Sequence, residues 1–121
     1  MHNYFMYHCI MFSKDYLKGS IKTILLNLLH SRGEMYGYEI TQMVKLRSEE
    51  SIVLTEGALY PALHKLQSLG LVKSHNKIVD GRTRKYYQLT SKGETQALQA
   101  KEEWQNFSSQ MNAIINPFSH A

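Results

Sequence analysis

The chain has 121 residues, of which 43% are hydrophobic and 20% charged, which is typical of one small globular domain and excludes two. No apolar run approaches the roughly 20 residues of a membrane-spanning helix, and Cys9 is the only cysteine, so an intrachain disulfide is excluded. These features predict a cytoplasmic protein with no membrane partner.

Residues 1–13 are expected to form an N-terminal extension that is either disordered or the product of an upstream start, because Met6 and Met11 follow Met1 closely. The segment lacks the basic start and the cleavage site of a signal peptide. His2, His8 and Cys9 could together hold a metal ion, but histidines near a terminus seldom do. We therefore predict no metal site.

A strongly apolar helix is predicted over residues 14–31. Its apolar side chains recur at helical spacing and fill one broad face, so the helix needs burial on more than one side. Gly33 follows as a C-terminal stop. The residues of this face are Leu17, Ile21, Ile24, Leu25, Leu28 and Leu29.

Two further helices are predicted before the middle of the chain. The first covers residues 37–47 and is followed by a polar loop over residues 47–51. The second begins after Thr55, a favourable N-cap residue, and ends at Gly70.

Gly57 and Pro61 lie in the first two turns of this third helix, although both residue types disfavour helices. Pro61 cannot donate a backbone hydrogen bond to the Gly57 carbonyl, so a bend or a loosened turn is predicted between them. Without a Cβ, Gly57 allows its backbone to approach a phosphate or a neighbouring helix closely.

A basic β-hairpin is predicted next, from residues 71–79 and 84–89, because Asp80-Gly81 between them is a strong turn signal. Residues 65–92 contain seven of the fourteen basic residues and a single acidic one. This distribution indicates either an anionic partner, nucleic acid first, or a solvated lysine-rich surface. Arg82 and Arg84 lie at the turn, within reach of phosphates, whereas Lys85 faces the other side.

The last helix is predicted over residues 91–116, opened by a capping box at residues 91–94 and ended by Pro117; residues 117–121 form a tail. Its apolar residues recur at steps of three and four and so form a continuous apolar stripe. This stripe is more apolar surface than one small domain can cover. A second copy is the predicted cover, and the alternative is that the helix folds back on its own core. The predicted dimer interface contains Leu17, Ile21, Trp104, Phe107, Met111 and Ile114.

The fold class that follows is mainly α with a small β-hairpin. Residues 14–90 form a winged helix-turn-helix, in which the third helix enters the major groove of DNA and the hairpin flanks it, and residues 91–116 form a C-terminal dimerisation helix. The sequence contains no nucleophile–base pair, no glycine-rich phosphate loop and no histidine pair at helical spacing. No enzymatic activity and no cofactor are predicted.

Three motifs resemble those of the PadR family of bacterial transcriptional regulators, in the family's order. The single short C-terminal helix is similar to that of the small PadR-like subgroup, and two shorter segments resemble its lactococcal multidrug-binding type. The resemblance implies a homodimeric winged-helix repressor that binds a palindromic operator in double-stranded DNA. The motifs are EMYGYEI (34–40), LTEGALYPALHKLQSLGLV (54–72) and DGRTRKYYQLTSKG (80–93), and the shorter segments are ILLNLL (24–29) and EEW (102–104).

The resemblance also implies the site residues. Those that would face DNA are Tyr38, Thr55, Tyr60, Lys65, Arg82, Arg84 and Lys85, and we add His64 as a candidate phosphate contact. The hydroxyls of Tyr38 and Tyr60 could instead lie in water while their rings pack. A planar hydrophobic effector would stack on Trp104 at the dimer interface, beside Ala100, Phe107 and Met111, and would release the repressor. The alternative is that Trp104 only packs at the interface and binds no effector. The alternative function is a winged-helix module that binds another protein and no DNA.

Overall fold

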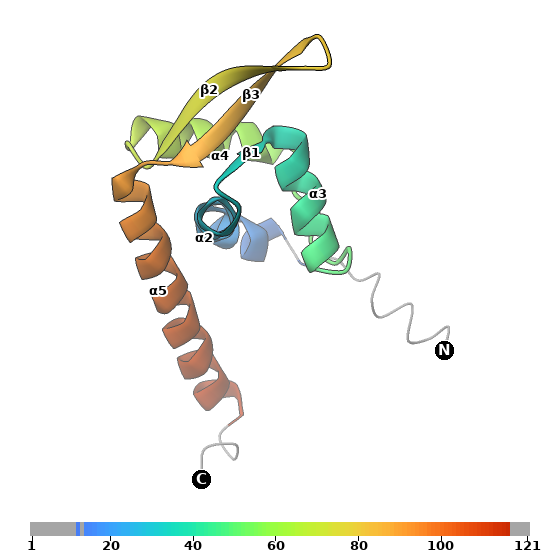
Figure 1. The fold of residues 1–121 in the computed structure, drawn as a ribbon. Coiled ribbons are helices and arrows are strands. Elements are labelled where there is room, and N and C mark those ends of the chain that lie inside the picture. Colours follow the sequence, from blue (N-terminus) through green and yellow to red (C-terminus); the bar gives the residue numbers. More distant parts are fainter. Residues whose placement is uncertain (1–11, 13, 117–121) are drawn as a thin grey trace, which may run out of the picture.

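The computed structural model describes residue 12 and residues 14–116. The tail 117–121 and all of the N-terminal extension except Phe12 lie outside this part of the chain, as do His2, His8 and Cys9. The elements follow in the order α2 (Lys14–Arg32), β1 (Glu34–Tyr36), α3 (Gly37–Arg47), α4 (Glu56–Ser68), β2 (Val72–Val79), β3 (Arg82–Leu89) and α5 (Ser91–Ile115) (Figure 1). The predicted class, mainly α with a β wing, is confirmed. In the part that the structure describes, we find no helix with the length and apolarity that crossing a membrane requires.

The core forms around α2, which lies between α3 and α5 and is seen end-on in Figure 1. Four leucines of α2 are buried, so this helix is covered on more than one side as predicted. Three leucines of α4 belong to the same core cluster. The largest side chains that are fully buried are Leu25, Leu26, Leu29, Met35, Ile40, Leu59, Leu63 and Tyr87.

The wing is a sheet of three strands and not the predicted two. β3 lies in the middle and pairs antiparallel with both β2 and the short strand β1. Periodicity could not reveal β1, because three residues after a helix are too few to establish an alternation. β3 also begins two residues earlier than predicted, at Arg82, which pairs with Val79 across the turn.

The hairpin turn is the predicted one. Asp80 and Gly81 have φ values of 51° and 76°, and two consecutive positive φ angles are the mark of the tight type I′ turn. Such a turn matches the twist of the strands, so the register from Val79↔Arg82 to Val72↔Leu89 continues without a bulge.

Helix α4 has the predicted ends. The Ala58 N–H donates to the Thr55 hydroxyl at 3.2 Å, and Gly70 follows the helix with a φ of +77°. The helix runs without interruption through Gly57 and Pro61, so the predicted irregularity does not break it, and a bend of its axis stays a prediction.

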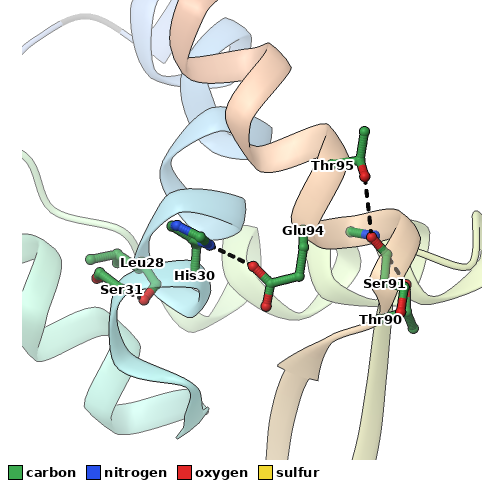
Figure 2. A network of polar contacts seen from close by, with 8 residues as sticks. Leu28, His30, Ser31, Thr90, Ser91, Glu94 and Thr95 are labelled. Carbon is green, nitrogen blue, oxygen red and sulfur yellow. Dashed lines mark hydrogen bonds and ion pairs between the residues drawn. The ribbon is translucent and has the colours of Figure 1, made fainter.

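Helix α5 begins differently from the prediction. Its N-cap is Thr90, whose hydroxyl accepts from the Gly93 N–H at 3.1 Å, so residues 91–94 do not form a capping box. Glu94, the predicted partner in that box, instead contacts Nδ1 of His30 at 2.5 Å (Figure 2). The first turn of α5 is therefore tied to α2 rather than closed on itself.

Only the first part of α5 packs on its own chain. Ala97 and Ala100 are buried against α2, and the rest of the helix projects away from the domain (Figure 1). The alternative that α5 folds back on its own core therefore holds for its first turns alone.

Candidate nucleic-acid interface

Helix α4 divides its residues between the core and the surface. Leu59, Leu63 and Leu66 point inward, whereas Thr55, His64 and Lys65 are exposed. Tyr38, at the start of α3, is also exposed. Four of the predicted DNA-facing residues thus lie on accessible surface of the two helices of the helix-turn-helix.

Gly57 also belongs to this exposed part of α4. A Cβ placed on it would meet only the Thr55 hydroxyl, at 3.9 Å. No neighbouring helix therefore requires a glycine at position 57. Close approach to a phosphate, the other role that the sequence suggested for Gly57, stays a prediction.

Tyr60 is the one predicted DNA-facing residue of α3 and α4 that is half-buried. A Cβ on Gly37 would lie 2.2 Å from the Tyr60 hydroxyl oxygen, so the end of the ring rests against the first turn of α3. Burial raises the pKa of the neighbouring Tyr87, and Tyr60 raises it further. The ring of Tyr60 thus fixes the distance between α3 and α4, and Gly37 is required by close approach, not by its backbone angles.

Gly37→Ala is therefore expected to destabilise the fold by about 1–3 kcal/mol, because a rigid ring must move. Tyr60→Phe in the same chain should recover part of that loss, since it removes the closest atom. Urea denaturation of the two single variants and the double variant measures both effects. The control is Gly19→Ala, which adds a Cβ to a helix with nothing within 4 Å; unchanged stability of Gly37→Ala would contradict the packing role.

Several cations of the basic segment already have partners within the chain. The Arg84 guanidinium lies over the Tyr36 ring at 4.4 Å, Lys77 pairs with Glu34, and Lys92 donates to the Leu69 carbonyl at 3.2 Å. Among the residues that the structure describes, four cations of this segment have no ion pair, cation–π contact or side-chain hydrogen bond: Lys65, Lys73, Arg82 and Lys85. Sequence reasoning did not single out Lys73, and the charge of its segment was the signal that could have done so.

The two faces of the wing differ, as strand alternation predicts. Lys85 shares a face with the buried Tyr87, and Arg82 and Arg84 share the opposite face with Tyr86. Arg82 and Lys85 are exposed, whereas Arg84 is half-buried.

A polar and aromatic network covers the outer face of the sheet. Glu34 of β1 reaches both His75, at 3.1 Å, and Lys77 of β2. The rings of Tyr86 and Tyr36 lie edge to face, with their centroids 5.4 Å apart. The Lys77 ammonium lies 4.8 Å from the centroid of the Tyr86 ring. These contacts join both outer strands across β3.

The hydrogen bond from Lys77 is the main reason why the pKa of Glu34 is lower than its ordinary value of 4.5, and the charges of Lys77 and His75 add to it. A carboxyl group whose pKa is lower in the folded state stabilises the fold above its ordinary pKa. It loses that contribution as the pH falls through the lower, folded value. The contribution of Glu34 to the link between β1 and β2 should therefore be lost in acid.

An NMR titration of the Glu34 carboxyl group should show its midpoint below 4.5. Lys77→Met should move the midpoint upward, because it removes the hydrogen bond and the charge. Lys73→Met, which removes a cation that does not contact Glu34, is the matched control. A midpoint that Lys77→Met leaves in place would contradict the assignment.

Trp104 lies at the meeting point of two clefts. One, of about 500 Å³, is bounded by α2, α3 and α5 and has Leu28, Met43 and Arg47 in its wall. The other, of about 430 Å³, is lined by Phe12, Leu17, Ile24, Ile52 and Trp104 among others. The contribution of α3 was not predicted, because only the tertiary structure brings Met43 near α5.

Of the remaining predicted effector and dimer residues, Leu17 joins Trp104 in the second cleft, and the others line neither cleft. Ala100 is buried in the core, and Phe107, Met111 and Ile114 lie exposed along the projecting part of α5. Leu17 and Ile21 are half-buried on α2. Within residues 12 and 14–116, no group of three or more His, Cys, Asp or Glu side chains is arranged to hold a metal ion.

Known proteins share parts of this sequence and this fold. The model of the PadR-like family of transcriptional regulators matches residues 25–99. A transcriptional regulator from Clostridium thermocellum is similar in structure, with a TM-score of 0.78 and 32% identity over 88% of this chain and 100% of that one. A PadR-like regulator from Bacillus cereus has a TM-score of 0.74 and 29% identity, over 85% and 98% of the two chains. A transcriptional regulator of Mycobacterium tuberculosis is 36% identical over 72 residues, which are 58% of this chain and 64% of that protein.

Proposed function

The chain belongs to the PadR-like family of transcriptional regulators, and from this premise we propose that it is a homodimeric repressor of the cytoplasm that binds a palindromic operator. The observation that carries the proposal is the exposed surface of α4 beside a wing with unpaired cations. α4 would enter the major groove, and the wing would lie against the adjoining backbone.

The proposed DNA surface combines two kinds of contact. Thr55 at the N-cap of α4 and His64 and Lys65 within the helix are exposed, and they would meet base edges or phosphates. Arg82, Lys85 and Lys73 on the wing would supply contacts to phosphates, which give affinity without sequence preference. Arg84 and Tyr60 support this surface through their packing on Tyr36 and Gly37.

The proposed dimer forms through α5. Phe107 and Ile114 are 63% and 74% exposed in the single chain, and Trp104 and Met111 lie on the same side of the helix. Apolar side chains in a row on a projecting helix favour an apolar cover, and a second α5 is self-complementary to it. Leu17 and Ile21 of α2 would border the same interface.

The proposed effector is a planar hydrophobic molecule that binds at Trp104. The indole is 52% exposed and borders both clefts, which supports stacking on its free face. A ligand held there in one dimer geometry would shift the population of DNA-binding forms. Because Trp104 is the only tryptophan, quenching of its fluorescence by planar lipophilic compounds tests this directly, and no quenching across a broad panel would remove the effector.

Selection of bound duplexes from a random pool tests the function as a whole. The expected product is a palindrome with half-sites about one helical turn, or a multiple of it, apart. Enrichment of single half-sites would contradict the dimer. No enrichment at all would favour the module that binds protein alone.

A further inference from the structure

The end of α4 and the beginning of α5 are fastened to each other in three ways. We define the α4–α5 joint as residues 69–71 together with residues 90–94. The Thr90 hydroxyl donates to the Gly70 carbonyl at 2.6 Å, and the Thr90 N–H donates to the Leu71 carbonyl at 3.0 Å. Lys92 adds its bond to the Leu69 carbonyl.

A single hydroxyl group serves both helices at this joint. The Thr90 hydroxyl oxygen accepts the Gly93 N–H and so caps α5, and the same hydroxyl donates to the carbonyl of Gly70, two residues past the last residue of α4. Leu69 is the C-cap residue of α4, and its carbonyl is among those that a helix end leaves without an internal partner. The Thr90 and Lys92 side chains at the start of α5 thus supply partners for the backbone at and just after the end of α4.

Gly93 brings the two backbones into contact. A Cβ at this position would lie 2.0 Å from the Leu71 carbonyl oxygen and 3.2 Å from Cβ of Leu89. Gly93 does not have a positive φ, so the glycine is required by close approach alone. The contact between His30 and Glu94 holds the same turn against α2 (Figure 2).

The direction of α5 therefore follows from the position of α4. Trp104 and Ile114 lie eleven and twenty-one residues beyond Gly93, or about 17 and 32 Å along a helix axis. A rotation of about 10° at the joint would move the far end of α5 by roughly 5 Å. One base-pair step is about 3.4 Å. A displacement of roughly 5 Å at the far end of α5 therefore exceeds the change in distance that one base pair makes between two half-sites.

From these contacts we infer that the α4–α5 joint positions the two recognition helices of the dimer. Thr90, Lys92 and Gly93 set the distance between the half-sites that the dimer accepts, although they lie outside the proposed DNA surface. This inference rests on the proposed dimeric, DNA-binding function. It adds that operator spacing is determined where α4 meets α5, as well as at the dimer interface.

The test compares operators that differ only in spacing. The duplexes are the selected palindrome, the same palindrome with one or two base pairs inserted at its centre, and a single half-site. For the wild-type protein, each insertion is expected to lower affinity at least about tenfold, because the second half-site is lost. Gly93→Ala and Thr90→Val should reduce this penalty at least about threefold or move the optimum, with half-site affinity unchanged. Lys92→Met, at an exposed side chain, should act in the same direction more weakly.

Gly19→Ala is the matched control, because it makes the same change in a helix where nothing lies within 4 Å, and it should keep the wild-type spacing profile. Circular dichroism and thermal unfolding show which variants are folded. If Gly93→Ala does not fold, the test is made with Thr90→Val and Lys92→Met. Folded variants with the wild-type profile would overturn the inference. A wild-type protein that selects no palindrome would instead overturn the proposed function.

Discussion

Phe107→Glu is expected to convert the proposed dimer into monomers and to lower operator affinity by roughly 100-fold or more. Phe107 is 63% exposed in the single chain, so the substitution should leave the fold intact. In the dimer, however, the carboxylate would be buried in an apolar seam with no partner, which is costly. The proposed dimer would also join two half-site contacts into one binding event, and a monomer would lose that gain.

Sedimentation velocity measures the dimer, and titration of the selected operator measures the affinity. Ser109→Glu is the control, because it introduces the same charge two residues further along, about 200° around the helix. It should remain dimeric and bind as the wild type does. A dimeric Phe107→Glu protein with wild-type affinity would show that α5 does not form the interface through this face.

The double substitution Arg82→Ala and Lys85→Ala should lower affinity for all DNA sequences by about 10- to 100-fold. Both side chains are exposed and have no ion-pair partner in the part of the chain that the structure describes. Each lost phosphate contact should also make the slope of log affinity against log salt less steep by about 0.9. Stability should hardly change, since exposed side chains contribute little to it.

Lys14→Ala with Lys45→Ala is the matched control, because it removes two exposed positive charges outside α4 and the wing. Its smaller effect should come from net charge alone. Fluorescence anisotropy of specific and random duplexes over a range of salt concentrations gives both quantities. If the wing variant keeps the wild-type salt slope, the wing does not contact phosphates.

The sequence predicted most of the fold because its signals are local. The apolar period of residues 14–31, the cap at Thr55, the stop at Gly70 and the turn at Asp80-Gly81 each act within a few residues. Structure confirmed all four. β1 was missed because its pairing with β3 joins residues far apart in the chain. The cap of α5 was assigned to Ser91 instead of Thr90 because Ser91 and Glu94 also have the spacing of a capping box, although the bond from Gly93 to Thr90 is local.

The candidate site followed the same division. A one-dimensional pattern gives the basic segment but not the partner of each cation. Lys77 forms an ion pair with Glu34, Arg84 lies over the Tyr36 ring, and Lys92 donates a hydrogen bond to the Leu69 carbonyl. Which cations remain for DNA depends on distances across the sheet, which no spacing along the chain reports.

By itself, the sequence determined a small winged-helix fold with a basic wing and an apolar last helix, because helix periods, caps and turns depend on neighbouring residues. Only the tertiary structure decided that Tyr60 packs on Gly37 and that Gly93 seats α5 against Leu71. These roles depend on how closely separate elements approach, and that distance is set by the packing of the whole core.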